Sequence, residues 1–382
     1  MKVYFVSPFD IRYSTGGTEW HIYEYAKFLM DNNVSVSLLI SNRKGHSKLT
    51  RDYKSISRRY SAIPKTHINQ IDVEVFRKAH MITYFGLPKD GIVYLPYSLL
   101  SSLLNILLKP PKQKYVVASH AFQLKNGKLI RGTHQVYETL LRAFVKIVLK
   151  AKGRDLSNIY FHVLNTEQVG YLTKIGICKK NITLIPPMMD TTPYKISPNK
   201  SKKLRIIHVG GAAKESSLIV QIIKILKKMD VIRNFEFYFV GYVQPYELIQ
   251  LSKTLSNIHI FAAASEKKKQ RILSDVDVMI VPAYETFSKT MLEGFVSGTY
   301  VITSNKTNSV KDIRKLGIQF SVTKTGDPSE YIPLLLKLAD MKAKGKNINP
   351  YKIRNREIAV KKFDMSVVLP YILKMFIEIE NS

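Results

Sequence analysis

The sequence predicts an α/β protein with two domains, each a parallel β-sheet covered by helices, and three observations support this. Short runs rich in valine, isoleucine, phenylalanine and tyrosine alternate with helical segments along the whole chain, which is typical of parallel sheets. Several of these runs are almost continuously apolar, as strands buried on both faces are. The length of 382 residues suits two hydrophobic cores better than one.

We expect strands in both halves of the chain. In the first half they are predicted at residues 2–7, 34–40, 81–85, 92–95, 115–119, 160–164 and 183–185. In the second half they are predicted at residues 204–209, 235–240, 259–261, 278–281, 300–303 and 319–322.

A proline-rich stretch at residues 186–203 is the best candidate for a linker between the domains. It contains Pro186, Pro187, Pro193 and Pro198, which exclude a helix and stiffen the connection. We therefore expect a first domain at 1–190 and a second at 191–365. The remaining residues, 366–382, include an apolar stretch that predicts a helix, and this helix could pack on either domain or return to the first.

The net charge of +30 raises the question of nucleic-acid binding. Basic residues exceed acidic ones by 16 in residues 1–190 and by 14 in residues 191–382, so the excess is spread evenly. A nucleic-acid binder usually concentrates its charge on one face, and we therefore favour phosphorylated substrates or anionic lipid surfaces. The densest local cluster, residues 43–65, is either a solvated loop or a contact with anionic lipid or a phosphorylated acceptor.

Targeting and cysteine signals are few. Residues 1–8 do not form a signal peptide, and the longest apolar stretch, 97–108, is shorter than the roughly 20 residues of a membrane span. We expect a cytoplasmic protein that could lie peripherally at the cytoplasmic face of a membrane. The single cysteine, Cys178, excludes an intramolecular disulfide and a cysteine-cluster metal site.

Two loops follow predicted strands at the position where open parallel sheets bind ligands. The first contains Gly16 and Gly17 and opens a helix, which suits either phosphate binding or a turn capped by Thr18. The second, residues 282–288, precedes a helix from about Lys289 to Ser297 that Gly298 ends. With Ser288 as the N-cap, this helix start could hold a diphosphate.

The helical pattern of this second segment also makes a prediction for Glu293. On a helical wheel the apolar face consists of Met291, Leu292, Phe295 and Val296, and Glu293 falls on the polar flank. The pattern alone therefore places Glu293 in solvent.

Several segments together resemble GT-B retaining glycosyltransferases, in particular those of glycosyltransferase family 4 (glycosyl transferases group 1). Residues 281–304 are similar to the nucleotide-binding signature of that family, with Glu285 and Glu293 as its two glutamates. Residues 16–19 resemble its N-terminal glycine loop, and 116–120 its strand ending in histidine. Residues 184–190 and 207–210 are similar to its interdomain stretch and to the first strand of its donor domain.

The resemblance implies a GT-B architecture of two Rossmann-like domains, with the acceptor bound by the first and a UDP- or GDP-linked sugar by the second. Glu293 would bind the ribose, Glu285 the donor sugar, and His120 would reach the transferred sugar. Such enzymes generally need no metal. The implied donor-binding set comprises Gly16, Gly17, Lys214, Phe287, Ser288, Lys289, Thr290 and Glu293.

Departures from the family pattern keep other functions open. Gly211 stands where the family has an arginine that grips the diphosphate, and Lys214 is slightly out of register. The acceptor could be a glycan, a lipid-linked molecule or a protein. The alternatives are a nucleotide-sugar epimerase or phosphorylase on the same scaffold, a catalytically weak donor-binding protein, and a basic nucleic-acid binder.

Overall fold

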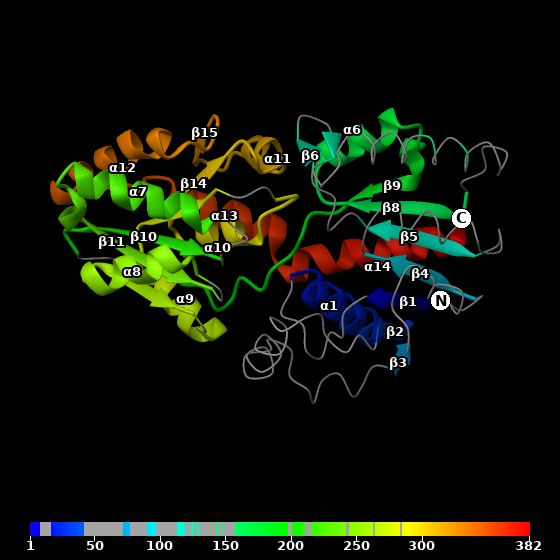
Figure 1. The fold of residues 1–382 in the computed structure, drawn as a ribbon. Coiled ribbons are helices and arrows are strands. Elements are labelled where there is room, and N and C mark those ends of the chain that lie inside the picture. The colour runs from blue at the N-terminus through cyan, green and yellow to red at the C-terminus, as the bar shows by residue number, and fades with distance from the viewer. Residues whose placement is uncertain are drawn as a thin grey trace. The chain divides into compact units, whose positions relative to one another are not determined.

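The computed structural model describes residues 1–7, 17–41, 72–76, 90–96, 113–118, 124–125, 128–129, 143, 147, 157–197, 201–210, 215–241, 244–262, 264–282 and 285–382. The chain divides into two compact units (Figure 1). Unit 1 comprises Met1–Met188 and Ser366–Ser382, and unit 2 comprises Met189–Met365.

Unit 1 contains a seven-stranded sheet with the order β3-β2-β1-β4-β5-β8-β9, in which every pairing is parallel. The order reverses between β1 and β4, as in doubly wound α/β folds. Its strands are β1 (Lys2–Ser7), β2 (Ser35–Ser41), β3 (Asp72–Phe76), β4 (Ile92–Leu95), β5 (Lys114–Ala118), β8 (Ile159–Val163) and β9 (Ile182–Leu184). A separate antiparallel pair is formed by β6 (Leu124–Lys125) and β7 (Lys128–Leu129).

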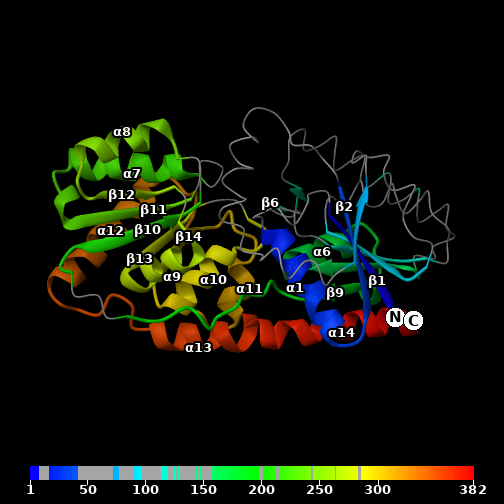
Figure 2. The same cartoon turned by 90° about the horizontal axis from the view of Figure 1, so that it is seen from below.

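The helices described in unit 1 include one from the far end of the chain. They are α1 (Gly17–Asp31), α6 (Thr166–Lys174), the 3-10 helix η2 (Lys179–Asn181) and α14 (Met365–Asn381). In Figure 2, α14 is the red helix beneath the sheet of unit 1. The Lys114 ammonium donates to the carbonyl oxygens of Ile379 at 2.7 Å and Glu380 at 2.8 Å. These contacts satisfy carbonyls that a helix end leaves unpaired, so the end of α14 is bound to the start of β5.

A buried aromatic cluster lies between the sheet and the helices of unit 1. It consists of Phe5, Tyr25, Tyr94, His162 and Phe376. The Tyr94 hydroxyl lies 2.8 Å from His162 Nδ1, and His162 Nε2 lies 3.0 Å from the carbonyl oxygen of Ile185. Because the carbonyl can only accept, Nε2 carries the proton and Nδ1 accepts from Tyr94. Burial lowers the pKa of His162 to about 4, against the opposing effect of the Ile185 hydrogen bond.

Because the pKa of His162 is lowered in the folded protein, we expect the protein to lose stability in mild acid. Below its ordinary pKa of 6.5, His162 takes up a proton in the unfolded chain but stays neutral in the folded one down to about pH 4. Its contribution is therefore complete above pH 6.5 and is lost as the pH falls toward 4. Urea unfolding, followed by the fluorescence of the single tryptophan, Trp20 in α1, should show a steeper pH dependence for the wild type than for His162→Gln. Equal pH dependence would contradict the prediction.

Unit 2 contains a six-stranded parallel sheet with the order β12-β11-β10-β13-β14-β15. Its strands are β10 (Leu204–Val209), β11 (Phe235–Val240), β12 (Ile258–Phe261), β13 (Val278–Val281), β14 (Tyr300–Ser304) and β15 (Ser321–Thr323). Its helices are α7 (Ser216–Lys228), α8 (Tyr246–Thr254), α9 (Glu266–Asp275), α10 (Lys289–Ser297), α11 (Val310–Lys315), α12 (Pro328–Ala343) and α13 (Lys352–Phe363), with the 3-10 helix η4 (Ile232–Asn234).

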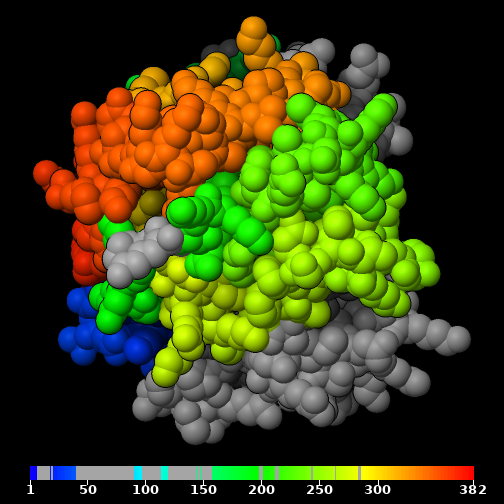
Figure 3. Space-filling model, turned by 90° about the vertical axis from the view of Figure 1, so that its left-hand side faces the viewer, coloured from blue at the N-terminus to red at the C-terminus, as the bar shows by residue number. Residues whose placement is uncertain are grey.

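The sheet of unit 2 is buried on both faces. Ile206 points into a core shared with α7, α8 and α12, whereas the next residue, Ile207, points into a core shared with α9, α10 and α13. Figure 2 shows the sheet between these two helix layers, and in Figure 3 the orange residues of α12 lie beside the green residues of α7. This two-sided burial explains the continuous apolar runs in the sequence.

The predicted α/β fold class is confirmed, and most predicted strands lie within one or two residues of the observed ones. Five of them, 2–7, 92–95, 204–209, 235–240 and 278–281, match residue for residue. The prediction missed β3, whose Asp72 and Glu74 interrupt the apolar pattern, and the predicted strand 81–85 lies outside the described residues. Among the described residues, no helix is long and apolar enough to cross a membrane.

Candidate functional site

The strand order of unit 2 fixes where a ligand would bind. The order reverses between β10 and β13, and open α/β sheets bind ligands at such a reversal, beyond the carboxyl ends of the strands. The residues that follow β10, β13 and β14 therefore share one edge of the sheet. They include Glu215 after β10, residues 285–288 after β13 and Lys306 after β14.

The three loops at this edge are tied together by hydrogen bonds and an ion pair. The carbonyl oxygen of Glu285 accepts from the backbone N–H of Asn308 at 3.0 Å, and Glu285 forms an isolated β-bridge with Thr307. The Lys306 ammonium lies 3.1 Å from a carboxylate oxygen of Glu215. The sequence analysis did not identify Lys306 as a site residue. Its position just after β14, the strand next to β13, could have indicated it.

The start and the end of α10 have the predicted form. Ser288 is the N-cap, and its hydroxyl oxygen accepts from the N–H of Met291 at 3.3 Å. Gly298 ends the helix with a φ of 76°, a left-handed conformation that favours glycine. Because Ser288 is fully buried and its hydroxyl oxygen caps the helix, its side chain is not available to bind an anion directly.

The predicted solvent exposure of Glu293 is wrong, since the residue is only 2% exposed. A helical wheel assumes one apolar face and one wet face, but α10 is covered by α9 and by α13 and is buried from Thr290 to Ser297. Glu293 Oε1 accepts from the Lys269 ammonium at 2.9 Å and from the Tyr194 hydroxyl at 3.1 Å. A buried carboxylate needs such partners to remain charged.

The charge of Glu293 is maintained by its surroundings. Burial opposes its ionisation, but the positive charges of Lys269 and Lys289 and the hydrogen bonds to Oε1 outweigh burial, so its pKa is lowered. Lys269 also lies 2.8 Å from a carboxylate oxygen of Glu266. These carboxylates raise the pKa of Lys269 despite its burial, so the lysine stays charged as well.

The other predicted site residues are distributed as follows. Phe287 is half-buried and packs edge-on against Phe363 of α13, with ring centroids 5.5 Å apart. Lys289 is half-buried and Thr290 is buried, both in the first turn of α10. Gly17 is the first residue of α1 in unit 1. His120, Gly16, Lys214 and the departure at Gly211 lie outside the described residues.

Gln244 is a further polar residue at this edge that sequence reasoning missed. Its Nε2 donates to the carbonyl oxygens of Gly210 at 3.2 Å and Gly241 at 3.1 Å, which joins the ends of β10 and β11. Its Oε1 is buried and has no hydrogen-bond partner among the residues that the structure describes. Within those same residues, no group of three or more histidine, cysteine, aspartate and glutamate side chains could hold a metal ion.

The fold of the whole chain is similar to that of solved glycosyltransferases. A glycosyltransferase from Rickettsia africae is 16% identical with a TM-score of 0.67, covering 100% of this chain and 99% of that one. Sucrose-phosphate synthase from Thermosynechococcus elongatus is 13% identical with a TM-score of 0.66 and the same coverage. HepE from Anabaena, solved with UDP and glucose, is 13% identical with a TM-score of 0.64, covering 100% of both chains. These likenesses show the GT-B fold.

A match to a family model adds the class of protein to this fold. Residues 203–340, which run from β10 into α12, match the family described as Glycosyl transferases group 1. Unit 2 therefore carries a glycosyl transferases group 1 domain, and the chain is a glycosyltransferase. A search of curated proteins by sequence found no match.

Proposed function

We propose that this protein transfers a sugar, with retention of configuration and without a metal ion, from a nucleotide-diphosphate donor to a glycan, lipid-linked or protein acceptor. The observation that carries the proposal is the buried, ionised Glu293 in the helix whose N-terminus opens at the sheet reversal. The match to a glycosyltransferase family supports it. So does the similarity in fold to HepE, which was solved with UDP and glucose and with UDP-glucose.

In this proposal Glu293 binds the ribose of the donor. Both hydrogen bonds that it receives from described residues end on Oε1. Oε2 is therefore the oxygen that accepts from a ribose hydroxyl. Because Lys269 and Tyr194 fix the carboxylate, little side-chain entropy is lost when the ribose binds.

The donor diphosphate lies at the N-terminus of α10, with Lys289 and Lys306 supplying positive charge. This pair takes the place of the family arginine, whose position Gly211 occupies. A phosphate competes with Glu215 for the Lys306 ammonium, which lies 3.1 Å from that carboxylate. As the sugar–phosphate bond breaks, fixed cations stabilise the charge that builds up on the leaving diphosphate.

Transfer breaks the bond between the anomeric carbon and the donor phosphate oxygen and forms one from that carbon to an acceptor oxygen on the same face. The acceptor proton passes to the departing phosphate. Glu285 binds hydroxyls of the transferred sugar, and His120 contacts that sugar. The basic segment 43–65 and the apolar segment 97–108 lie outside the described residues, as do residues 8–16. Contact with an anionic membrane and a cytoplasmic location therefore stay predictions.

A panel of UDP-, GDP- and other nucleotide sugars tests the proposed function. At about 100 times the dissociation constant, the right donor should stabilise the protein by about 2.7 kcal/mol, seen as a rise in Tm. Responding donors are then incubated with glycan, lipid-linked and peptide acceptors, and the anomeric configuration of the product is read by NMR. No response to any nucleotide sugar would contradict the proposal.

The same assay separates the second candidate function, a donor-binding protein with weak catalysis. The loss of the family arginine at Gly211 favours this candidate. It predicts stabilisation by a nucleotide sugar without transfer to any acceptor. Isomerisation or phosphorolysis of the donor without an acceptor would instead indicate an epimerase or a phosphorylase.

A further inference from the structure

Ion pairs link the proposed ribose-binding carboxylate to the start of α9. The Lys269 ammonium lies 2.9 Å from Glu293 Oε1 and 2.8 Å from Glu266 Oε2, so one cation joins two carboxylates. α9 follows β12 as α10 follows β13, and because the sheet is parallel, both helices begin at its carboxyl edge. Glu266, the first residue of α9, is therefore at the same edge as the proposed donor site.

The two carboxylates differ in their access to solvent. The side chain of Glu293 is 3% exposed and that of Lys269 is 12% exposed, whereas that of Glu266 is 55% exposed. Within the described part of the chain, Lys269 is the only hydrogen-bond or ion-pair partner of the Glu266 side chain, and it contacts Oε2. A carboxylate oxygen can accept two hydrogen bonds. A ligand at this edge can therefore reach the Glu266 carboxylate, which a largely buried lysine holds in place.

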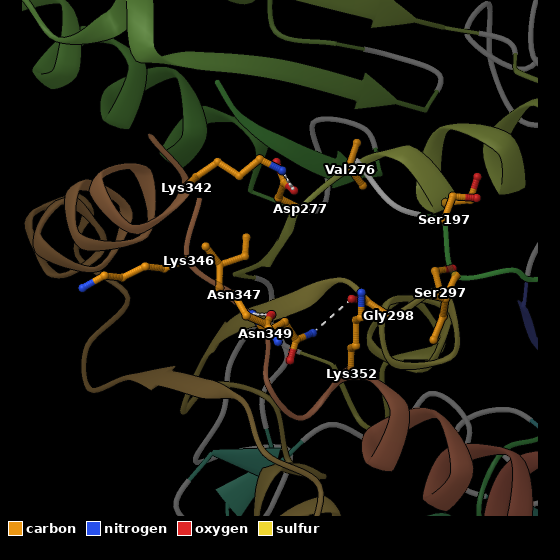
Figure 4. A pocket seen from close by; sticks show the side chains of 13 residues that line it. Ser197, Val276, Asp277, Ser297, Gly298, Lys342, Lys346, Asn347, Asn349 and Lys352 are labelled. Atoms are coloured by element: carbon orange, nitrogen blue, oxygen red, sulfur yellow. Dashed lines mark hydrogen bonds and ion pairs between the residues drawn. The ribbon is translucent and has the colours of Figure 1, made fainter. Parts of the chain in front are cut away.

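A second carboxylate–lysine pair in unit 2 has no such capacity. Asp277 is 8% exposed, its Oδ1 lies 2.7 Å from the Lys342 ammonium, and its Oδ2 accepts from the backbone N–H of Arg205 at 3.0 Å. Figure 4 shows Asp277 and Lys342 pointing toward one another in the wall of a cavity. Asp277 precedes β13, so this pair is at the opposite edge of the sheet from the proposed donor site. Both oxygens of Asp277 are used within the protein, whereas Glu266 keeps acceptor capacity for a ligand.

The hydrogen-bonding pattern of the nucleobases decides which of them suits an accessible carboxylate. A carboxylate only accepts hydrogen bonds, and its two oxygens favour a ligand with two parallel N–H donors. Guanine has two adjacent donors on its Watson–Crick edge, N1–H and the amino group at carbon 2. Uracil has a single donor, N3–H, between two carbonyl oxygens, and adenine and cytosine have an amino group beside an unprotonated ring nitrogen. Guanine is therefore the base that a carboxylate binds through both of its oxygens.

We infer that Glu266 selects the base of the donor and that this base is guanine, so that the donor is a GDP-linked sugar. The inference rests on the proposed function, in which Glu293 binds the ribose. The base is attached to the ribose carbon next to the one that carries the 2′-hydroxyl, so a ribose on Glu293 places the base among the groups around that carboxylate. Glu266 accepts from N1–H and from the amino group of guanine. Lys269 fixes Glu266 and Glu293 relative to one another, so one lysine aligns the ribose contact with the base contact.

Calorimetric titration of GDP, UDP, ADP and inosine diphosphate into the full-length protein tests the inference. Inosine diphosphate is the most informative probe, because its base keeps N1–H but lacks the amino group of guanine. We expect GDP to bind at least about fivefold more tightly than each of the others, as one bidentate contact to a base provides. Glu266→Gln should weaken GDP binding by a similar factor and abolish the preference for GDP over inosine diphosphate, because glutamine replaces one acceptor oxygen with a donor.

The matched control is Glu247→Gln. Glu247 is in the first turn of α8, its side chain is 54% exposed, and it forms an ion pair with Lys224, so it resembles Glu266 in position, exposure and pairing. This variant should bind all four nucleotides like the wild type. Both substituted side chains are exposed, so both variants should fold.

The other outcomes separate this inference from the proposed function. Tighter binding of UDP or ADP than of GDP would overturn the inference and leave the proposed function in place. If Glu266→Gln lowered the affinity for all four nucleotides by the same factor, Glu266 would act only through Lys269 and Glu293, and its role in base selection would be wrong. A preference for GDP that persisted in Glu266→Gln would exclude that role as well. No binding of any nucleoside diphosphate up to about 10 mM would overturn both proposals.

Discussion

Replacing Glu293 with glutamine is expected to weaken nucleotide binding by about 10- to 100-fold, the effect of losing hydrogen bonds to a charged acceptor. Glutamine keeps the shape of the side chain but removes the negative charge that the ribose hydroxyls bind. The fold should survive, because Lys269 keeps its ion pair with Glu266 at 2.8 Å. Affinity should be measured by calorimetry with the nucleoside diphosphate that the donor panel identifies, and with its nucleoside.

The matched variant for this experiment is Lys306→Gln. Glu293 contacts the ribose in our proposal, so Glu293→Gln should lower the affinity for the nucleoside and for the nucleoside diphosphate by the same factor. Lys306 contacts the diphosphate in our proposal, so Lys306→Gln should lower the affinity for the nucleoside diphosphate and leave the affinity for the nucleoside unchanged. A Glu293→Gln variant that binds the nucleoside as tightly as the wild type would refute the ribose role.

The pH dependence of binding provides a further check on the same carboxylate. The pKa of Glu293 lies below its ordinary value of 4.5, so its interaction is complete above that value and is lost only as the pH falls through the lower folded pKa. Lys269 has a raised pKa and stays charged up to alkaline pH. Nucleoside affinity should therefore be constant between about pH 6 and 9. A decrease within that range would contradict this assignment of charges.

Replacing Phe376 with alanine is expected to destabilise unit 1 by about 3–5 kcal/mol, the usual cost of removing a buried phenylalanine ring. The ring is fully buried, and its centroid lies 5.9 Å from that of Phe5 and 6.0 Å from that of Tyr94. Urea unfolding followed by Trp20 fluorescence reports on unit 1, because the only tryptophan of the chain is in α1.

Tyr371→Ala is the control for this prediction, since Tyr371 is on the same helix and is 56% exposed. A surface substitution of this kind should change the free energy of unfolding by less than about 0.5 kcal/mol. Equal losses in both variants would show that the helix, rather than the buried ring, carries the effect. No loss in Phe376→Ala would show that α14 does not stabilise unit 1.

The fold could largely be predicted from the sequence because its signals are local. Strands buried on both faces are continuous apolar runs, and the ends of α10 are marked by Ser288 and Gly298. The edge strand β3 contains Asp72 and Glu74, so it is not a continuous apolar run and was not predicted. Edge strands often have charged residues, because charge discourages pairing with other chains.

The site could be predicted only in part because its electrostatics depend on long-range contacts. The partners of Glu293 are Lys269, 24 residues away, and Tyr194, 99 residues away. No spacing rule connects these three positions. The helical wheel therefore predicted that the Glu293 carboxylate is exposed to solvent. The ion pair between Lys306 and Glu215 spans 91 residues and was missed for the same reason.

The chain order has a consequence for synthesis on the ribosome. Domains generally fold as units, the N-terminal one first. Here unit 1 supplies the first residues made, yet its aromatic core is incomplete until α14 emerges after all of unit 2. Unit 2 is one uninterrupted stretch and can fold earlier. Unit 1 is therefore the first unit to be synthesised and the last to complete its fold. Until α14 has been made, the apolar surface that α14 covers is exposed to chaperones and proteases.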